Sequence, residues 1–147
     1  MDKVDEKILQ MLQENARVPV KEIAKEVFLS SPAVSARIDR LVQINLIKGY
    51  HTTIDRTKLG YDVTAFISLE MLPAQKAQFY PYIKNCPNVL ECCCITGQYS
   101  QLIKVAFHST AELETFLGSL QQFGRTSTQI VFSNPVEPRE VQISFDE

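Results

Sequence analysis

The spacing of apolar residues changes near residue 60, and this change limits the possible folds of the chain more than any other feature. Before it, apolar residues recur every three or four positions, as along the buried stripe of an α-helix. After it they alternate with polar residues in short runs, starting with 63–69, which is typical of half-buried β-strands. A length of 147 residues is sufficient for two small domains. We therefore expect a helical domain over 1–50, a linker strand over 51–61 and a second domain over 62–147.

Three helices are predicted in the first domain. The first ends near Asn15, the second covers about eight residues after Pro19, and the third spans 31–43. The predicted caps and first-turn residues are Asp2 or Asp5 for the first helix, Pro19 for the second, and Ser30 or Ser31 with Pro32 for the third. Two short helices joined by a tight turn form a helix-turn-helix motif, here at about 20–39. A turn leading into a strand is expected over 45–50.

The third helix leaves one face available for nucleic acid. Val34, Ile38 and Leu41 share one side and are expected to hold the helix against the other two. The outward side chains near its N-terminal end are mostly short, so the helix can approach the floor of the major groove. The candidate DNA-contacting residues are Ser31, Ala33, Ser35, Ala36, Arg37 and Arg40, with Lys48 beyond the helix. On periodicity alone, the alternative is a plain three-helix bundle with a solvated basic face.

The charge is divided unevenly between the two parts. The total is −2, which by itself gives no indication of a nucleic-acid partner. Residues 1–60 hold ten Lys and Arg against eight Asp and Glu, whereas 61–147 hold five against nine. A basic first part favours contact with a polyanion, although short segments also vary by a few charges by chance. The charged residues 1–7 do not resemble a signal peptide and no apolar run reaches a membrane span, so we expect a cytoplasmic protein without a membrane partner.

The second domain has a duplicated strand–helix–strand pattern. Strands are predicted at 63–69, 89–95, 102–107 and 126–132, and a further alternating run ends the chain at 141–145. Pro81 is expected to kink or restart the first helix, a capping box at 109–112 begins the second, and Gly124 suits the position just past its end. This order predicts an α+β ferredoxin-like βαββαβ fold with helices on one face of an antiparallel sheet. Outward apolar residues on the other face favour pairing of two sheets in a homodimer; these are Phe66, Leu90 and Leu102.

Motifs for catalysis or metal binding are weak. Cys86, Cys92, Cys93 and Cys94 contain no C-x-x-C pair for zinc. We expect them to be small, buried, reduced residues, with Cys92 and Cys94 on one face of a strand and Cys93 on the other. A redox switch, or a Cys94–His108 nucleophile, is the alternative. His51 and His108 form no metal pair and the five glycines form no phosphate loop, so we expect a protein that is not an enzyme and has no cofactor.

Ordered motifs along the whole chain resemble the Lrp/AsnC, or feast/famine, family of transcriptional regulators. They are Leu9-x-x-Leu12-x-x-Asn15-Ala16-Arg17, Glu22-Ile23-Ala24, Leu29-Ser30, Ala33-Val34-Ser35-x-Arg37-Ile38-x-Arg40-Leu41, Ile47-Lys48-Gly49-Tyr50, and Asp55 followed by Leu59-Gly60. The resemblance implies a winged helix-turn-helix domain that binds double-stranded DNA, in a homodimer that assembles to an octamer. Phe28 stands where the turn usually carries glycine, so a differently shaped turn is expected. Ala36 and Asp39 replace residues that are often basic in the family.

The segment 96–100 resembles the turn motif of the family's C-terminal effector domain. The resemblance implies that a small amino acid binds there, between dimers. The candidate effector-binding residues are Thr96, Gly97, Gln98, Tyr99 and Ser100, with Thr126 and Thr128 offering hydroxyl groups. Ser100 replaces the usual aspartate and cannot form an ion pair with an α-ammonium group. The alternatives are a hairpin turn without ligand, and a sensing or assembly module with weak or no specific DNA binding.

Overall fold

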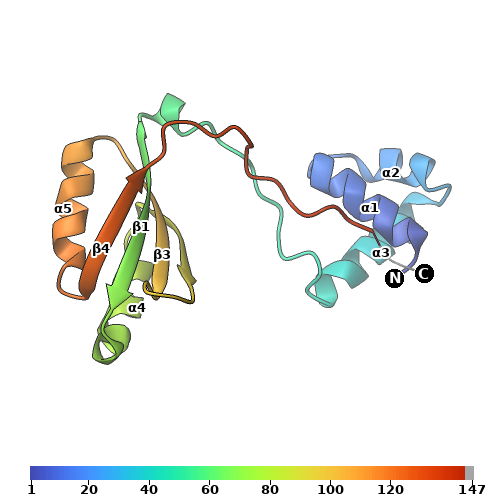
Figure 1. The fold of residues 1–147 in the computed structure, drawn as a ribbon. Coiled ribbons are helices and arrows are strands. Elements are labelled where there is room, and N and C mark those ends of the chain that lie inside the picture. The colour runs from blue at the N-terminus through green and yellow to red at the C-terminus, as the bar shows by residue number, and fades with distance from the viewer. Residues whose placement is uncertain (145–147) are drawn as a thin grey trace. The chain divides into compact units, whose positions relative to one another are not determined.

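The computed structural model describes residues 1–144, which form two compact units (Figure 1). The helical unit contains residues 1–53 together with the described part of the C-terminal tail, 137–144. The sheet unit is Ile54–Val136. The expected boundary after residue 50 is close to the observed one, but the tail groups with the helical unit rather than with the second domain. Among the described residues, no helix is long and apolar enough to cross a membrane.

The helical unit has the three helices predicted from periodicity. They are α1 (Lys3–Glu14), α2 (Val20–Glu26) and α3 (Ser31–Gln43). Asp2 caps α1 in a capping box with Asp5, and the Ser30 hydroxyl caps α3 by accepting from the backbone N–H of Ala33. Pro19 precedes α2 as its cap residue instead of lying in its first turn. The core joins all three helices through Ile8, Ile23, Ala24 and Val34, with Ile38 packed beside them.

The turn between α2 and α3 keeps the left-handed conformation in spite of its bulky residue. Phe28 has a φ of 56° and is 93% exposed. The expectation of a differently shaped turn was therefore wrong. A non-glycine residue in this region costs roughly 1–2 kcal/mol of stability. Because the Phe28 ring makes little contact with the helical unit, its packing does not offset that cost.

The strands expected after α3 are absent. Residues 44–62, all of which the structure describes, form a turn at 44–47, an irregular stretch over 48–55 and one 3₁₀ helix at Thr57–Leu59. The turn expected at 45–50 is present at its start, but the strand that it was expected to lead into and the linker strand expected at 51–61 are not formed. Asp55 fixes the 3₁₀ turn instead, because its carboxylate accepts from the backbone and side chain of Thr57.

The sheet unit has the predicted ferredoxin-like topology. Its elements are β1 (Val63–Met71), α4 (Lys76–Lys84, after a 3₁₀ turn at Pro73–Gln75), β2 (Val89–Cys94), β3 (Gln101–Phe107), α5 (Thr110–Leu120) and β4 (Gly124–Ile130). The strand order is β2-β3-β1-β4 and every pairing is antiparallel. The core lies between one sheet face and the two helices, and includes Ile67, Leu69, Phe79, Ile103 and Leu120. Helix α4 runs through Pro81 without the predicted restart.

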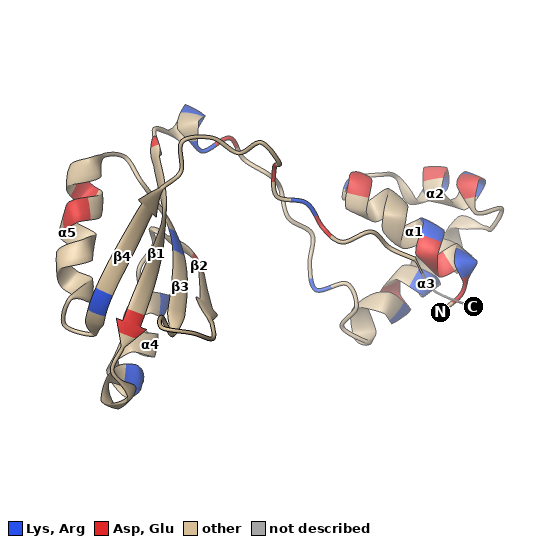
Figure 2. Cartoon of the chain, viewed as in Figure 1, with Lys and Arg blue, Asp and Glu red and all other residues tan. Residues whose placement is uncertain are grey.

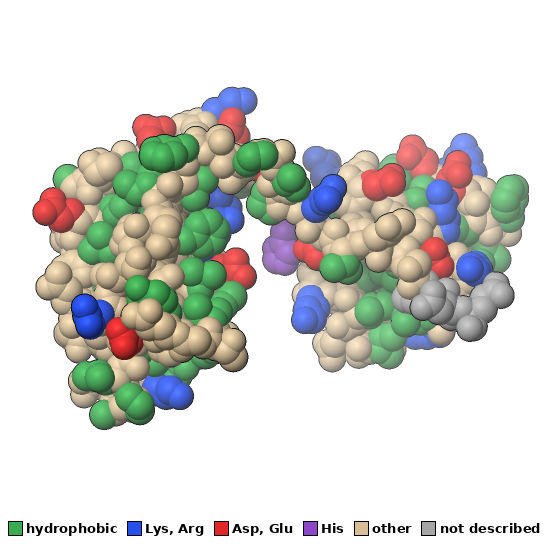
Figure 3. All heavy atoms as spheres, viewed as in Figure 1, with side chains coloured by type: hydrophobic (Ala, Val, Ile, Leu, Met, Phe, Trp, Pro, Cys, Tyr) green, Lys and Arg blue, Asp and Glu red, His purple; other side chains and the backbone are tan. Residues whose placement is uncertain are grey.

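The opposite sheet face carries a mixture of apolar and polar side chains. The register places Phe66 of β1 beside Lys104 of β3, and Leu102 beside Ser68. The Lys104 ammonium lies 5.5 Å from the centre of the Phe66 ring, a distance that permits a cation–π contact. Leu90 is 40% exposed at the edge strand. Figure 3 shows hydrophobic side chains reaching the surface of the sheet unit at several places.

Gly124 is the first residue of β4 and does not end α5 as predicted. Its φ is 152°, and it pairs with Met71 at the end of β1. A Cβ atom at this position would lie 2.0 Å from the carbonyl oxygen of Glu70. Since atoms that close overlap, only glycine allows β1 and β4 to meet here.

The C-terminal tail lies along α1. The Gln10 amide donates to the carbonyl of Ile143 at 3.1 Å, and the Gln13 amide donates to that of Val141 at 3.0 Å. Residues 141–144 form no strand, so the strand expected at 141–145 was wrong over those positions, and Phe145 lies outside the described residues. The tail therefore attaches to a helix through backbone carbonyls rather than to the edge of the sheet.

Candidate nucleic-acid interface and effector turn

Helix α3 presents an exposed stripe that only partly matches the predicted contact set. Ala36 and Arg40 are exposed, as is Lys48 beyond the helix. Four other candidates are half-buried: Ser31, Ala33, Ser35 and Arg37. The stripe also contains three residues that sequence reasoning did not select, Pro32, Asp39 and Gln43. Pro32 and Asp39 lie four residues before and three residues after Ala36, and Gln43 lies four residues after Asp39, so a helical projection centred on Ala36 could have found them.

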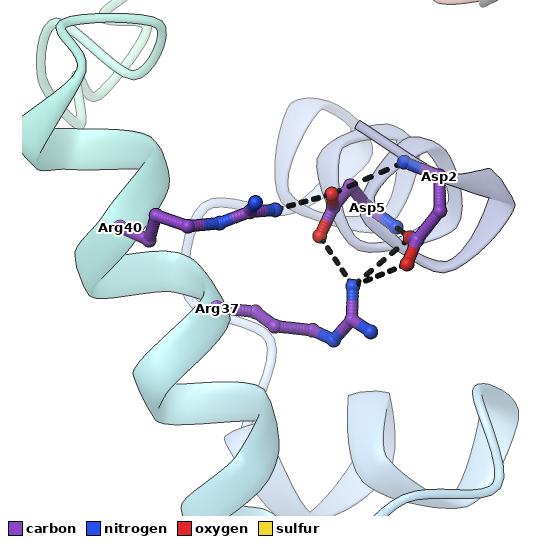
Figure 4. Close-up of polar contacts among 4 residues, drawn as sticks. All are labelled: Asp2, Asp5, Arg37 and Arg40. Carbon is purple, nitrogen blue, oxygen red and sulfur yellow. Dashed lines mark hydrogen bonds and ion pairs between the residues drawn. The ribbon is translucent and has the colours of Figure 1, made fainter.

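Arg37 and Arg40 point toward the start of α1, where two carboxylates receive them (Figure 4). Arg37 donates from Nη1 to Asp5 at 2.8 Å and to both oxygens of Asp2 at 2.9 and 2.8 Å. Arg40 donates from Nη2 to the other oxygen of Asp5. Asp5 is fully buried, whereas the Arg40 side chain is 50% exposed. The two carboxylates and two guanidinium groups together tie α3 to the start of α1.

The carboxylate of Asp5 stays ionised because of these contacts. Burial acts to raise its pKa, but hydrogen bonds from Arg37 and Arg40 outweigh burial and hold the pKa below its ordinary value. The pKa of Asp2 is also lowered, first by the backbone N–H of Asp5 and then by Arg37. Since two positive and two negative groups cancel, these arginines add little net field for attracting DNA.

This network was missed by the sequence analysis, which gave Asp2 and Asp5 only a capping role. A signal was available, because Asp5 is three residues before Ile8 and four before Leu9, on the buried side of α1. An acidic residue on a buried stripe requires a cationic partner. Figure 2 shows Lys and Arg interspersed with Asp and Glu over the helices of this unit. Lys48 is exposed, and none of the ion pairs found among the described residues includes it.

The candidate effector residues 96–100 form the turn between β2 and β3. Gly97 has a φ of 108°, and a Cβ added there would meet no atom within 4 Å, so glycine is required by conformation and not by crowding. The Ser100 N–H donates to the carbonyl of Leu69 at 3.0 Å, and its hydroxyl accepts from the N–H of Met71 at 3.3 Å. Ser100 therefore anchors the turn to the end of β1.

Thr126 and Thr128 lie on β4, the opposite edge strand. Thr126 pairs with Leu69, whose other neighbour is Gln101 directly after the turn. Neighbouring strands are about 4.8 Å apart, so Thr126 lies roughly 10 Å across the sheet from that position. Thr128 is two residues further along, opposite Ile67. The structure brings Thr126 to the same end of the sheet as the turn, whereas Thr128 lies nearer its middle.

The cysteines and histidines do not form the alternative nucleophilic pair. Cys94 pairs with Gln101 at the start of β3, whereas His108 follows its other end, about seven residues and roughly 20 Å away. His108 instead holds the carbonyl of Gly60 at 2.8 Å through Nδ1. The expectation of buried cysteines was wrong, since Cys94 is exposed and the other three are half-buried. The predicted faces are correct: Cys92 and Cys94 lie opposite Ile103 and Gln101, and Cys93 opposite Leu102.

Comparisons with known proteins give matches to both units. The AsnC-type helix-turn-helix domain matches residues 1–42, and the Lrp/AsnC ligand binding domain matches residues 64–141. Regulatory protein AsnC of Haemophilus influenzae is 33% identical over 141 residues, covering 92% of this chain and 94% of its own. The structure of Bacillus subtilis LrpC matches with a TM-score of 0.88 and 27% identity, over 94% of this chain and 99% of that one. The Neisseria meningitidis regulator NMB0573 in complex with L-methionine matches with a TM-score of 0.86 and 26% identity, over 93% of each chain.

Proposed function

Because this chain belongs to the Lrp/AsnC family of transcriptional regulators, we propose that it binds duplex DNA through α3 and that a small amino acid at the β2–β3 turn modulates that binding. The family consists of regulators and not of enzymes. The observation that carries the DNA proposal is the start of α3, where a serine cap precedes a turn of short side chains. Short side chains at a helix N-terminus allow close approach to base edges and phosphates.

The proposed contacts combine the exposed stripe of α3 with neighbouring positions. Ala36 lies nearest the groove floor, Gln43 can offer its amide to a base edge, and Lys48 can reach a phosphate. Ser31, Ala33 and Ser35 line the approach at the N-terminal end. Arg37 and Arg40 keep their carboxylate partners and position the helix, so their contribution to DNA contact comes from the donors that those carboxylates do not engage.

Ala36→Glu is expected to weaken binding of duplex DNA by about 10-fold or more, because a carboxylate would face phosphates and base edges at the centre of the interface. The melting temperature should stay within about a degree of the parent protein, since position 36 is exposed on a helix. Fluorescence anisotropy with labelled DNA from upstream of the protein's own gene measures this, with salt varied to count phosphate contacts.

The matched control for Ala36→Glu is Ala111→Glu, the same change at an exposed position of α5 in the sheet unit. It should leave DNA affinity unchanged. If Ala36→Glu and Ala111→Glu bound duplex DNA with equal affinity, DNA would have to contact a surface other than the exposed stripe of α3. Weak binding with no salt dependence in the parent protein would favour the alternative of an assembly module that does not read DNA.

The effector proposal rests on the open turn 96–100 and on the match of this unit to a ligand binding domain. The turn exposes Thr96 and Gln98 on either side of Gly97, which has a positive φ and is also exposed, and Tyr99 is half-buried. Ser100 uses its hydroxyl on β1, so we assign it to shaping the turn. Recognition of the ammonium group must then come from another oxygen, and the Thr126 hydroxyl at the same end of the sheet is a candidate.

A thermal-shift panel of the twenty amino acids tests this effector proposal, beginning with L-methionine because of the NMB0573 complex. A ligand at 100 times its Kd should stabilise the folded state by about 2.7 kcal/mol and raise the melting temperature by several degrees. Tyr99→Ala should abolish the shift, while Tyr50→Ala, which removes an exposed tyrosine outside the turn, should preserve it. If no amino acid at millimolar concentration raised the melting temperature, the proposal of an effector site would be contradicted.

Self-association is the remaining part of the proposal. The open sheet face carries Phe66 and Leu102 without a covering helix, and a second copy would bury both. A dimer would present two α3 helices to successive major grooves about 34 Å apart. Sedimentation velocity distinguishes a dimer, a closed octamer and a monomer, and a monomer at every concentration would contradict this part.

A further inference from the structure

Two thiols on the helix-side face of β2 meet around one buried amide. Cys92 Sγ lies 3.6 Å from Oε1 of Gln101, and Cys94 Sγ lies 3.5 Å from the same oxygen. The Tyr80 hydroxyl lies 3.3 Å from Cys94 Sγ. Gln101 is 1% exposed, whereas Cys94 is exposed at the surface. Both sulfur atoms therefore face a single point, and one of them is open to solvent.

The contacts that hold these thiols are weak and easily exchanged. The hydrogen bonds between Gln101 and Cys94 involve sulfur, which is a weak donor and acceptor. The hydrogen bond from the Gln101 amide to the Tyr80 hydroxyl is 3.5 Å long, beyond the length of strong hydrogen bonds. Hydrogen bonds from Tyr80 and then from Gln101 lower the pKa of Cys94, which makes its thiolate accessible. Burial raises the pKa of Cys92 to about 11.

A direct disulfide between Cys92 and Cys94 does not fit the strand. Residues two apart on a strand are about 6.6 Å apart, and their parallel Cβ atoms are about as far from each other. A disulfide requires Cβ atoms about 3.5–4.5 Å apart. A bridging cation reaches further, because two thiolate bonds of about 2.3 Å in line separate the sulfurs by about 4.6 Å. Rotation of the Cys92 and Cys94 side chains about χ1 can bring their sulfur atoms to this distance.

A site with only two thiolate ligands suits few kinds of metal ion. Within residues 1–144, no group of three or more His, Cys, Asp and Glu is placed to hold a metal ion. Zinc, which takes four protein ligands in structural sites, is therefore a poor fit. Soft monovalent copper prefers thiolates and is satisfied by two of them. No metal site was expected from the sequence because it contains no C-x-x-C pair, but on a strand it is C-x-C that places two thiols on one face.

We propose that Cys92 and Cys94 form a two-thiolate site for one Cu(I) ion on the edge strand of the sheet unit. Two Cu–S bonds form, both thiol protons leave to solvent, and no atom changes oxidation state. The complex of two thiolates with one Cu(I) ion carries one net negative charge. The site does not depend on DNA or effector binding.

Competition between the reduced full-length protein and bicinchoninate for Cu(I) tests this proposal. The parent protein should withdraw one Cu(I) per chain. Cys92→Ser and Cys94→Ser should each lower the affinity by about 100-fold or more, since loss of a direct ligand costs at least as much as loss of a supporting group. Cys93→Ser is the matched control, because Cys93 faces the opposite side of the sheet beside Glu91, and it should bind like the parent.

Equal losses in Cys93→Ser and Cys94→Ser, or failure of the parent to compete for Cu(I), would overturn the site. If Cys92→Ser proves unfolded by circular dichroism, the surface variant Cys94→Ser still decides, since its side chain is exposed. X-ray absorption of the copper-loaded parent gives an independent readout and should show two sulfur neighbours. One copper per two chains would instead indicate a bridge between copies.

Discussion

Replacing both Arg37 and Arg40 by methionine is expected to destabilise the helical unit by about 3–4 kcal/mol at pH 7. The change keeps side-chain volume and removes both cations from the fully buried Asp5. Loss of the partner from a buried ion pair costs about 3–5 kcal/mol. The destabilisation cannot exceed about 4 kcal/mol, because the unpaired Asp5 can take up a proton instead of staying charged. Protonating a carboxyl with an ordinary pKa of 3.9 at pH 7 requires about that free energy. Urea denaturation without DNA measures the change.

The stability difference between the parent protein and the double variant is expected to depend on pH. In the parent protein the lowered pKa of Asp5 contributes stability that is fully present above the ordinary pKa and is lost as the pH falls through the folded value. In the double variant, uncompensated burial raises that pKa, so acidification restores stability. The difference between the two proteins should therefore shrink steadily from pH 7 toward pH 4.

The triple variant that adds Asp5→Leu is the control for the double variant. It removes the buried charge together with its partners, and replacement of a buried ion network by apolar groups is often neutral. Most of the lost stability should return. If the double variant stayed within 1 kcal/mol of the parent, Asp5 would have to be solvated, contrary to its burial.

The second large effect is expected at Gly124, where alanine should remove more than about 4 kcal/mol of stability from the sheet unit. The three atoms nearest to an added Cβ are the oxygen and carbon of Glu70 at 2.0 and 2.9 Å and the Cα of Met71 at 3.1 Å. All are backbone atoms of β1, so no side chain can move aside. Relief requires opening the pairing of Met71 with Gly124 at the end of the β1–β4 ladder. Thermal denaturation and the exchange rates of β4 amides measure the loss.

Gly118→Ala provides the matched control. Gly118 lies inside α5, and a Cβ added there would meet nothing within 4 Å. Alanine should stabilise this helix by roughly 0.5–1 kcal/mol, because glycine loses more backbone freedom on folding. Similar effects of both substitutions would show that the contact at Gly124 is relieved at little cost.

The parts of the fold that depend on local periodicity were predictable from the sequence. The bounds of α3 were predicted at 31–43 and are observed there, because a serine cap, a proline in the first turn and an apolar stripe agree. The strands of the sheet unit were predicted to within a few residues for the same reason. The strand expected from alternation did not form over 141–144, because alternation alone does not supply a neighbouring strand to pair with.

The candidate site was less predictable because its charges are decided by tertiary contacts. Arg37 and Arg40 follow the spacing of outward residues on α3, yet their partners come from α1, more than thirty positions earlier. Likewise, Ser100 stands in a ligand motif but bonds to the backbone of β1. Spacing along one element indicates which face a residue occupies, but it does not identify the group that meets it from another element.

The attachment of the C-terminal tail to α1 has a consequence for the order in which the protein is made. The hydrogen bonds of Gln10 and Gln13 close loops of 133 and 128 residues, so they form only after Val141 and Ile143 have been synthesised. The three helices emerge from the ribosome before the sheet unit and can collapse on their own short-range contacts, and the sheet follows as a nearly complete module. The helical unit therefore begins folding before the sheet unit and is completed after it.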